Sequence, residues 1–346
     1  MEFTEFAINL SGTHFVVAVA LLSIALLLLG ARQKAFSPQL DRGTGDVLRG
    51  FFILTVVLHH ISQRLPGLGV LSPYAGRAGY LSVAMFFLMS GYGLSASARP
   101  DSGFAAYALK RLSRVYIPCV LVNTVLWFAL GHAGSFLGVL NPLCYDNTQW
   151  FVVTILIFYV AHFASTKLSS HPSLPLLAFT AAYIAGCFYL RLGFWWCVSS
   201  LCFPLGCFWR ENEGAIGKML AKISAIHAAL ALTIVFVALT AVKQPTVLPF
   251  VLSPLFCLIV ALLTSRFSLQ SKPLALAGAC SFEIYILHMK LLVILLHLMS
   301  RFGLTGSIWI VPYFVVLIAS GYLFHRFNTL LAKTLIPGPR KLAQQA

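Results

Sequence analysis

Long apolar runs separated by short polar breaks follow one another along most of the chain, as at 15–29 and 230–242. A membrane-spanning α-helix needs about 20 mostly apolar residues, whereas a transmembrane barrel would show ~10-residue segments of alternating polarity. The pattern therefore predicts about eleven spanning helices. Their expected ranges are 12–30, 47–65, 79–97, 115–131, 149–166, 173–190, 193–209, 223–241, 246–265, 275–299 and 307–326.

The expected fold is an all-α, polytopic membrane bundle of about 10 core helices with one additional N-terminal span. Residues 1–46 are expected to hold the additional span and a cytoplasmic linker, 47–328 the membrane domain, and 329–346 a cytoplasmic tail. Composition supports this picture, because only 10% of residues are charged, against about 25% in soluble domains.

Positive charge gives the predicted bundle a direction. If the first span runs from outside to inside, most of the 24 Lys and Arg residues lie in cytoplasmic loops, as the positive-inside rule requires. The N-terminus is then extracytoplasmic and the C-terminus cytoplasmic. Topology thus accounts for the net charge of +15, and no nucleic-acid partner is expected. The spacing of Cys and His predicts no metal site.

Arg49 and His60 are the most informative polar pair, because both lie within one apolar run. Eleven steps of about 100° bring them to the same helix face, roughly 16 Å apart. A neutral imidazole can act as a general base, and a guanidinium can bind an oxyanion. The alternatives are an interhelical hydrogen bond for His60 and a topogenic charge for Arg49. His59 projects off this face and is the weaker candidate.

Lys110, Arg111 and Arg114 precede a predicted helix on the cytoplasmic side. Three cations at a helix start suit a polyphosphate. The positive-inside signal alone is the other interpretation.

Several further polar residues interrupt later spans. Ser90 and Tyr92 could hydrogen-bond a ligand or a neighbouring helix, and Trp150 could be an interfacial residue or contact an acceptor. Glu283 is costly within a membrane unless it is paired or protonated. It could orient an imidazole from another helix, contact the acceptor, or pair with Lys290 or an arginine.

In this order, these motifs resemble the acyltransferase 3 family of bacterial membrane acyltransferases. The resemblance covers about residues 45–326 and rests on Arg49-Gly50 with His60, on Phe86–Tyr92, on Arg111–Pro118, on Trp150-Phe151 and on Ser281–His288. The chain departs from the family pattern in its additional first span, in Tyr92-Gly93 where many relatives have Phe-Leu, and in the doubled histidine His59-His60.

The resemblance implies O-acylation, usually acetylation, of a cell-surface or exported carbohydrate, with acyl-CoA as the cytoplasmic donor and no bound cofactor. The implied protein is a multi-pass protein of the bacterial cytoplasmic membrane that works beside envelope-polymer biosynthesis proteins. The implied roles are catalytic for His60, Arg49 and Glu283, acyl-CoA-binding for Arg111, Arg114 and Lys110, and acceptor-binding or supporting for Ser90, Tyr92, Trp150, His288 and His59. A transporter or flippase for a lipid-linked sugar or organic anion is the rival hypothesis.

Overall fold

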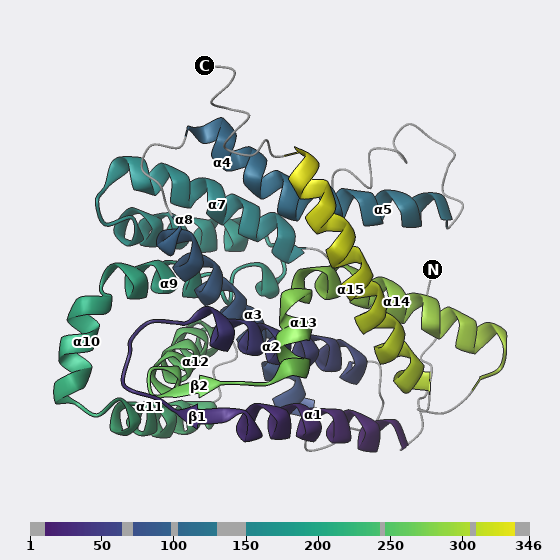
Figure 1. Cartoon of the computed structure of the whole chain (residues 1–346), viewed down its shortest axis with the longest axis horizontal. Coiled ribbons are helices and arrows are strands. Elements are labelled where there is room, and N and C mark those ends of the chain that lie inside the picture. Colours follow the sequence, from purple (N-terminus) through teal and green to yellow (C-terminus); the bar gives the residue numbers. More distant parts are fainter. Residues whose placement is uncertain are drawn as a thin grey trace.

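The computed structural model describes residues 11–63, 72–97, 103–129, 150–242, 246–304 and 309–335. Helices dominate these ranges, with one short antiparallel ribbon at the edge (Figure 1). The helices and strands are α1 (Ser11–Leu29), β1 (Ala31–Gln33), α2 (Arg42–Ser62), α3 (Ser72–Ala96), α4 (Phe104–Arg111), the π-helical segment η2 (Leu112–Tyr116), α5 (Ile117–Ala129), α7 (Trp150–Leu168), α8 (Ser173–Tyr189), the 3-10 turn η4 (Phe194–Trp196), α9 (Cys202–Glu211), α10 (Glu213–Lys222), α11 (Ala225–Thr240), α12 (Leu248–Thr264), β2 (Phe267–Leu269), α13 (Lys272–Ala279), α14 (Ser281–Arg301) and α15 (Ile310–Leu335).

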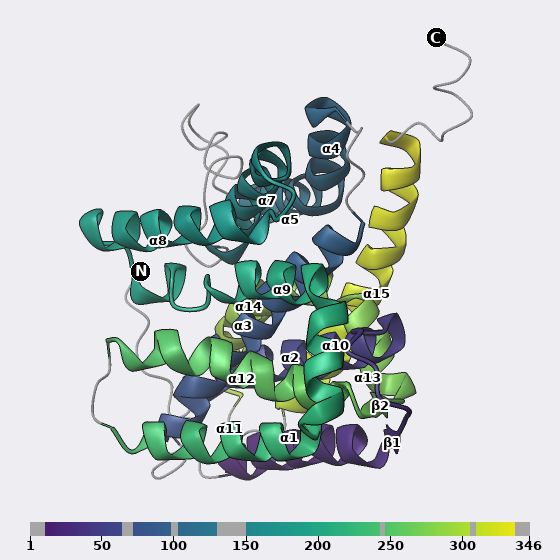
Figure 2. The same ribbon diagram turned by 90° about the vertical axis from the view of Figure 1, so that its left-hand side faces the viewer.

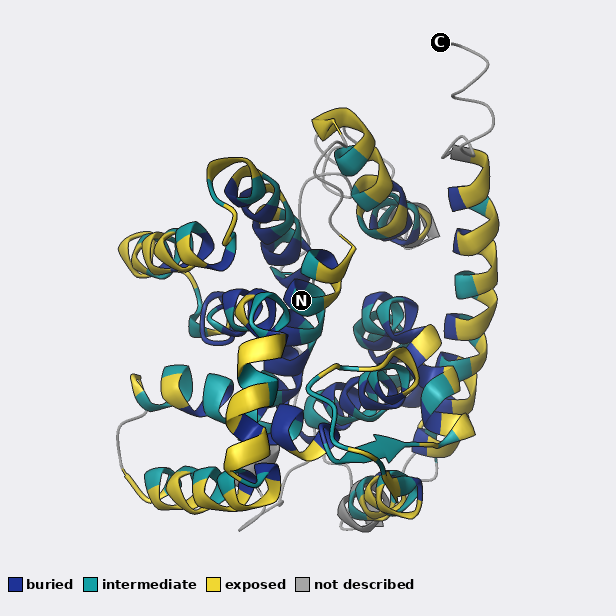
Figure 3. Ribbon diagram, turned by 60° about the vertical axis from the view of Figure 1, so that its left-hand side comes forward, coloured by how far each residue is buried: buried dark blue, intermediate teal, exposed yellow. Residues whose placement is uncertain are grey.

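The core lies along α2, α3 and α9, and apolar side chains also cover the outside of the bundle. Phe52, Phe87 and Phe203 are buried there. In contrast, Ile234 of α11 and Leu323 of α15 are 62% and 67% exposed, and α15 is exposed along its outer face (Figure 3). An apolar exterior around an apolar core suits a protein whose solvent is lipid.

Five of the described helices are long and apolar enough to cross a membrane. They are Arg42–Ser62, Arg77–Ala96, Trp150–Leu168, Ser281–Arg301 and Ile310–Thr334. A sixth span results if α10 and α11, which meet at 92°, are taken together. The all-α membrane architecture is thus confirmed, whereas a count of about 10 core spans plus one is not.

Two predicted spans are broken in the structure. The range 193–209 contains the turn η4 and then α9, and between them the Ser199 and Ser200 hydroxyls donate to the backbone carbonyls of Tyr80 and Cys197. The range 275–299 is divided at Cys280, whose backbone leaves the helical conformation between α13 and α14. The last span, predicted to end at 326, continues to Leu335.

Two helix crossings depend on glycine. A Cβ on Gly50 of α2 would lie 1.8 Å from the Leu274 carbonyl oxygen, and one on Gly278 of α13 would lie 1.8 Å from that of Asp46. Gly91 of α3 meets α9 in the same way, with 2.1 Å to the Phe203 carbonyl oxygen. Gly91 therefore permits the close approach of α3 and α9, whereas a Cβ on Gly93 would meet nothing within 4 Å.

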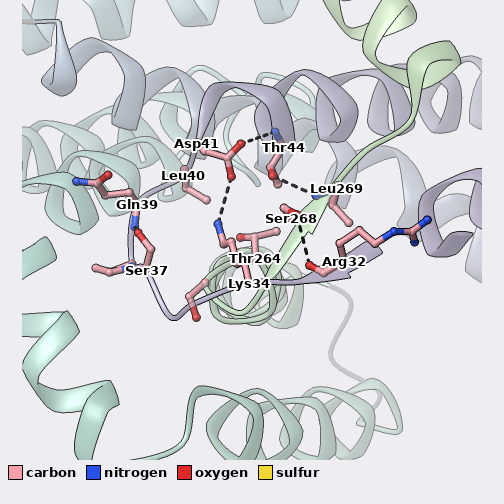
Figure 4. A network of polar contacts seen from close by, with 12 residues as sticks. Arg32, Lys34, Ser37, Gln39, Leu40, Asp41, Thr44, Thr264, Ser268 and Leu269 are labelled. Carbon is pink, nitrogen blue, oxygen red and sulfur yellow. Dashed lines mark hydrogen bonds and ion pairs between the residues drawn. The ribbon is translucent and has the colours of Figure 1, made fainter. Parts of the chain in front are cut away.

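The linker after α1 is fastened to the bundle beside the start of α2 (Figure 4). Strand β1 pairs with β2 through Ala31–Leu269, Arg32–Ser268 and Gln33–Phe267. Asp41 then caps α2 by accepting from the Thr44 N–H at 2.8 Å, and it pairs with Lys34 at 3.2 Å. The additional span is thereby tied to the rest of the chain by backbone and side-chain bonds.

Gly278→Ala should destabilise the protein, because its methyl group has no space against the α2 backbone. Overpacking of this kind costs about 1–3 kcal/mol. Gly93→Ala is the matched control, which should be neutral or stabilising because alanine favours a helix. Thermal unfolding of both variants in detergent checks this. Equal melting temperatures for Gly278→Ala and Gly93→Ala would contradict the prediction, because they would show that α2 and α13 can move apart to accept the methyl group.

Asp41→Ala should cost about 0.5–2 kcal/mol, the value of a helix N-cap, whereas Asp41→Asn should keep most of the cap. Burial raises the pKa of Asp41, but hydrogen bonds from Thr44 and the charge of Lys34 outweigh it, so the pKa lies below its usual value. The ionised carboxylate therefore stabilises the fold above the unfolded pKa, and this contribution is lost as the pH falls through the folded pKa. Chemical denaturation from pH 7 to pH 3 measures both effects; a wild-type profile for Asp41→Ala would contradict them.

Candidate active site

The basic cavity, of about 830 Å³, opens among α2, α3, η2, α7, α14 and α15. Its positively charged lining comes from α2, from the junction of α4 and η2, and from α15. These cations are Arg42 and Arg49 of α2, Arg111 at the end of α4, Arg114 of η2 and Lys333 near the end of α15, and Glu283 of α14 also lines the cavity. The C-terminal part of α15 lies beside α4 in both ribbon views (Figures 1 and 2). Lys333 is thereby brought to the same part of the cavity as Arg111 and Arg114. Cations concentrated in one cavity suit a polyanionic ligand.

Arg111 is held by aromatic rings. Its guanidinium lies 5.4 Å from the ring centroids of both Tyr107 and Tyr159, and its buried Nε has no hydrogen-bond partner among the described residues. The π-helical turn that follows has a local cause. Pro118 has no N–H, and the Ile117 N–H reaches back five residues to the Leu112 carbonyl. Arg111 and Arg114, on either side of the start of this turn, both line the basic cavity.

Glu283 meets two side chains of α15 within the same cavity. Its Oε1 lies 3.2 Å from His325 Nδ1 and accepts from Asn328 Nδ2 at 3.0 Å. The Asn328 side chain is buried, and its Oδ1 has no partner among the described residues. Glu283 thus contacts an imidazole from another helix, but this imidazole belongs to His325 and not to His60. The cluster adds hydrogen-bond acceptors to a cavity that is otherwise rich in donors.

The aromatic cavity, of about 460 Å³, lies at the other end of α2. Its lining includes His59, His60 and Gln63 together with five aromatic side chains. The aromatic residues are Tyr80, Trp150, Phe194, Trp195 and Tyr285. No Lys, Arg, Asp or Glu from the described residues lines it. An imidazole surrounded by rings can bind and deprotonate a neutral, hydroxyl-bearing molecule.

The two cavities share a wall. Val56, Val83 and Tyr285 line both of them. Arg49 lines the basic side and forms an ion pair with Asp46 one turn earlier, whereas His60 lines the aromatic side. The predicted pair thus shares a helix but faces two different cavities. The arrangement can admit a charged molecule from one side and an uncharged one from the other.

A family model for an acyltransferase domain matches residues 45–326. The chain belongs to the acyltransferase 3 family. Membership implies membrane acyltransferase activity. Searches of curated proteins and of solved structures find no match.

His288 is a neighbour of His60. Its ring centroid lies 5.2 Å from that of His60, and its Nδ1 donates to the Tyr285 carbonyl oxygen at 2.6 Å. His288 is buried, and its Nε2 has no hydrogen-bond partner among the described residues. His288 therefore supports the wall between the cavities and the ring of His60.

The remaining predicted residues divide between the cavities and the linker. Ser90 lines the basic cavity and Trp150 the aromatic one, whereas Lys110 lines neither. Tyr92 also lines neither; its hydroxyl donates to Glu213 and accepts from the Leu40 N–H at 3.2 Å. Tyr92 thus fastens the linker of the additional span.

Sequence reasoning missed four residues of the site. Arg42 and Lys333 were counted only as topogenic charges, although both line the basic cavity. His325 lies within the predicted last span, where a polar residue is a candidate for function, whereas Asn328 lies beyond its predicted end at 326. That signal could mark His325, but it could not indicate Glu283 as the partner of either residue.

Proposed function

We propose that the protein transfers an acyl group, with acetyl the expected one, from cytoplasmic acyl-CoA to a hydroxyl of a cell-surface or exported carbohydrate in the bacterial cytoplasmic membrane. The observation that carries the proposal is the pair of cavities with a common wall, one cationic and the other aromatic around His60.

The basic cavity matches the donor. The phosphates of coenzyme A would contact Arg111, Arg114 and Lys333, because guanidinium and ammonium groups form charge-assisted bonds with phosphate oxygens. The pantetheine arm would extend along α2 past Arg49. Glu283 and Asn328 provide acceptors for its amide N–H groups. The lining cations lie on the side that the positive-inside rule assigns to the cytoplasm.

The aromatic cavity matches a sugar acceptor. Aromatic rings offer apolar faces to the C–H groups of a pyranose, and the absence of charged groups from the described lining favours a neutral ring. Trp150 and Trp195 stand at this cavity with His60. Transfer would take place at the boundary formed by Val56, Val83 and Tyr285, where the pantetheine arm would bring the thioester between these side chains to an acceptor hydroxyl held near His60.

The reaction follows from this placement. His60 Nε2 takes the proton of the acceptor hydroxyl as its oxygen attacks the thioester carbonyl carbon. The new C–O bond forms, the C–S bond breaks, and the coenzyme A thiolate receives a proton from the imidazolium. Direct transfer needs no covalent enzyme intermediate, although an acyl-histidine route would use the same residue. A transporter would not require His60 to be an acid–base group.

His60→Ala should lower kcat by at least about 100-fold, the lower end for loss of a general base. The assay uses inverted bacterial membrane vesicles that contain the protein and radiolabelled acetyl-CoA, and it measures label in base-labile esters of the vesicle glycans. His171→Ala, which removes an exposed histidine, is the control and should be unaffected. Full transfer by His60→Ala, at equal protein level, would refute the assignment.

Arg111→Ala should raise the KM for acetyl-CoA about tenfold or more, since a lost charge-assisted bond is worth about 1.5–3 kcal/mol. Lys218→Ala removes an equal charge from an exposed position outside both cavities and should leave the KM unchanged. Initial rates against acetyl-CoA concentration in the same vesicles provide both values. If the two variants had the same KM, Arg111 would have no role in donor binding.

A further inference from the structure

Gln63 lies directly after α2, where its side-chain amide bridges two adjacent histidines. Its Oε1 is 3.1 Å from His60 Nδ1, and its Nε2 is 3.1 Å from His59 Nε2. The backbone N–H of Gln63 is bonded to carbonyl oxygens of the last turn, at His59 and Ile61. All three side chains line the aromatic cavity. The amide is therefore anchored at its backbone and in contact with both rings.

The hydrogen bonds of the Gln63 amide indicate which tautomer each neutral imidazole adopts. An amide oxygen can only accept, so His60 Nδ1 carries the hydrogen and its Nε2 carries the lone pair. An amide N–H can only donate, so the lone pair of His59 Nε2 is used by Gln63. Nε2 carries the lone pair in both rings, but the two rings differ in how they meet Gln63. Gln63 bonds to the Nε2 of His59 and to the Nδ1–H of His60.

The ring of His59 is itself fixed by α3. A Cβ on Gly79 would lie 2.6 Å from His59 Nε2 and Cδ2, so the ring packs against the α3 backbone at a position that only glycine leaves open. In this place His59 accepts from the Gln63 Nε2–H, and the amide oxygen at the other end of the same side chain faces His60. Contacts therefore run in sequence from Gly79 through His59 and Gln63 to His60.

We propose that Gln63 and His59 are positioning residues that hold His60 in the Nδ1–H tautomer during acyl transfer. The proposal rests on the proposed function, in which His60 Nε2 is the base. As Nε2 takes the proton of the acceptor hydroxyl, Nδ1–H stays bonded to Gln63 Oε1. The imidazolium formed there is also at the C-terminal end of α2, where the helix dipole stabilises positive charge. The proton then leaves Nε2 for the departing thiolate, and the tautomer is unchanged.

Gln63→Leu removes the amide with little change of size, and Gln63→Glu keeps an acceptor for His60 Nδ1–H. Gln63→Leu should lower kcat by about 10- to 100-fold with the KM for acetyl-CoA unchanged, because tautomer control affects the proton transfer and not donor binding. Gln63→Glu should restore kcat to within a few-fold of wild type. A purely structural role would not give this rescue.

His59→Ala tests the second step. On its own it should lower kcat less than Gln63→Leu does, and in the Gln63→Leu background it should have no further effect, because His59 acts through Gln63. The rates come from the vesicle assay with radiolabelled acetyl-CoA, normalised to inserted protein. If Gln63→Leu does not insert, Gln63→Met replaces it in the same comparisons.

Three results would overturn the proposal: wild-type kcat in Gln63→Leu, equal loss in Gln63→Glu and Gln63→Leu, or additive losses in the double variant. His60→Ala, measured in parallel, separates this failure from that of the proposed function. If His60→Ala is inactive while Gln63→Leu is fully active, the positioning role of Gln63 and His59 is refuted and the proposed function stands. If His60→Ala is active, the assignment of His60 as the base is refuted as well.

Discussion

The close crossing of α2 and α13 is the contact on which the site depends. Gly50 and Gly278 bring the two backbones together with no room for a side chain between them. Arg49 precedes Gly50, and Gly278 itself lines the basic cavity. The crossing therefore fixes the position of Arg49 against the start of α14, where Glu283 lies. Because α2 is a continuous helix, it also fixes the place of His60 at its far end.

Apolar patterning predicted most of the helical segments, because burial in lipid or in a core of helices requires the same apolar residues. It missed the short helices α4 and α10, which lie outside the predicted ranges. It could not predict where helices break. Cys280 and the Ser199-Ser200 turn interrupt apolar sequence, with Gly278 in the last turn of α13 and Pro204 in the first turn of α9 as the nearby helix-ending residue types. The hydrogen bonds of these breaks go to other parts of the chain or to the preceding turn. The cap of α2 had a local signal in Asp41 and Thr44, yet the span was expected to begin five residues later.

For the site, spacing along one helix predicted that Arg49 and His60 share a face, but not that this face borders two cavities. The division arises from Tyr285 and Val83, which come from other helices and form the wall with Val56. The same limit applies to Glu283. Its cost within a membrane indicated that a partner exists, while the identity of His325 and Asn328 depends on how α14 packs against α15.

The separation of charge between the cavities has a consequence for recognition. Arginine and lysine side chains line the basic cavity, and no Lys, Arg, Asp or Glu among the described residues lines the aromatic one. Under the proposed function, long-range attraction would collect a polyanionic donor on one side without drawing it to the imidazole. On the other side, ring faces would select the acceptor by shape and apolar contact. Donor and acceptor preferences would then be set by different residues, so that the acceptor could change through the aromatic lining while the donor site and His60 stayed as they are.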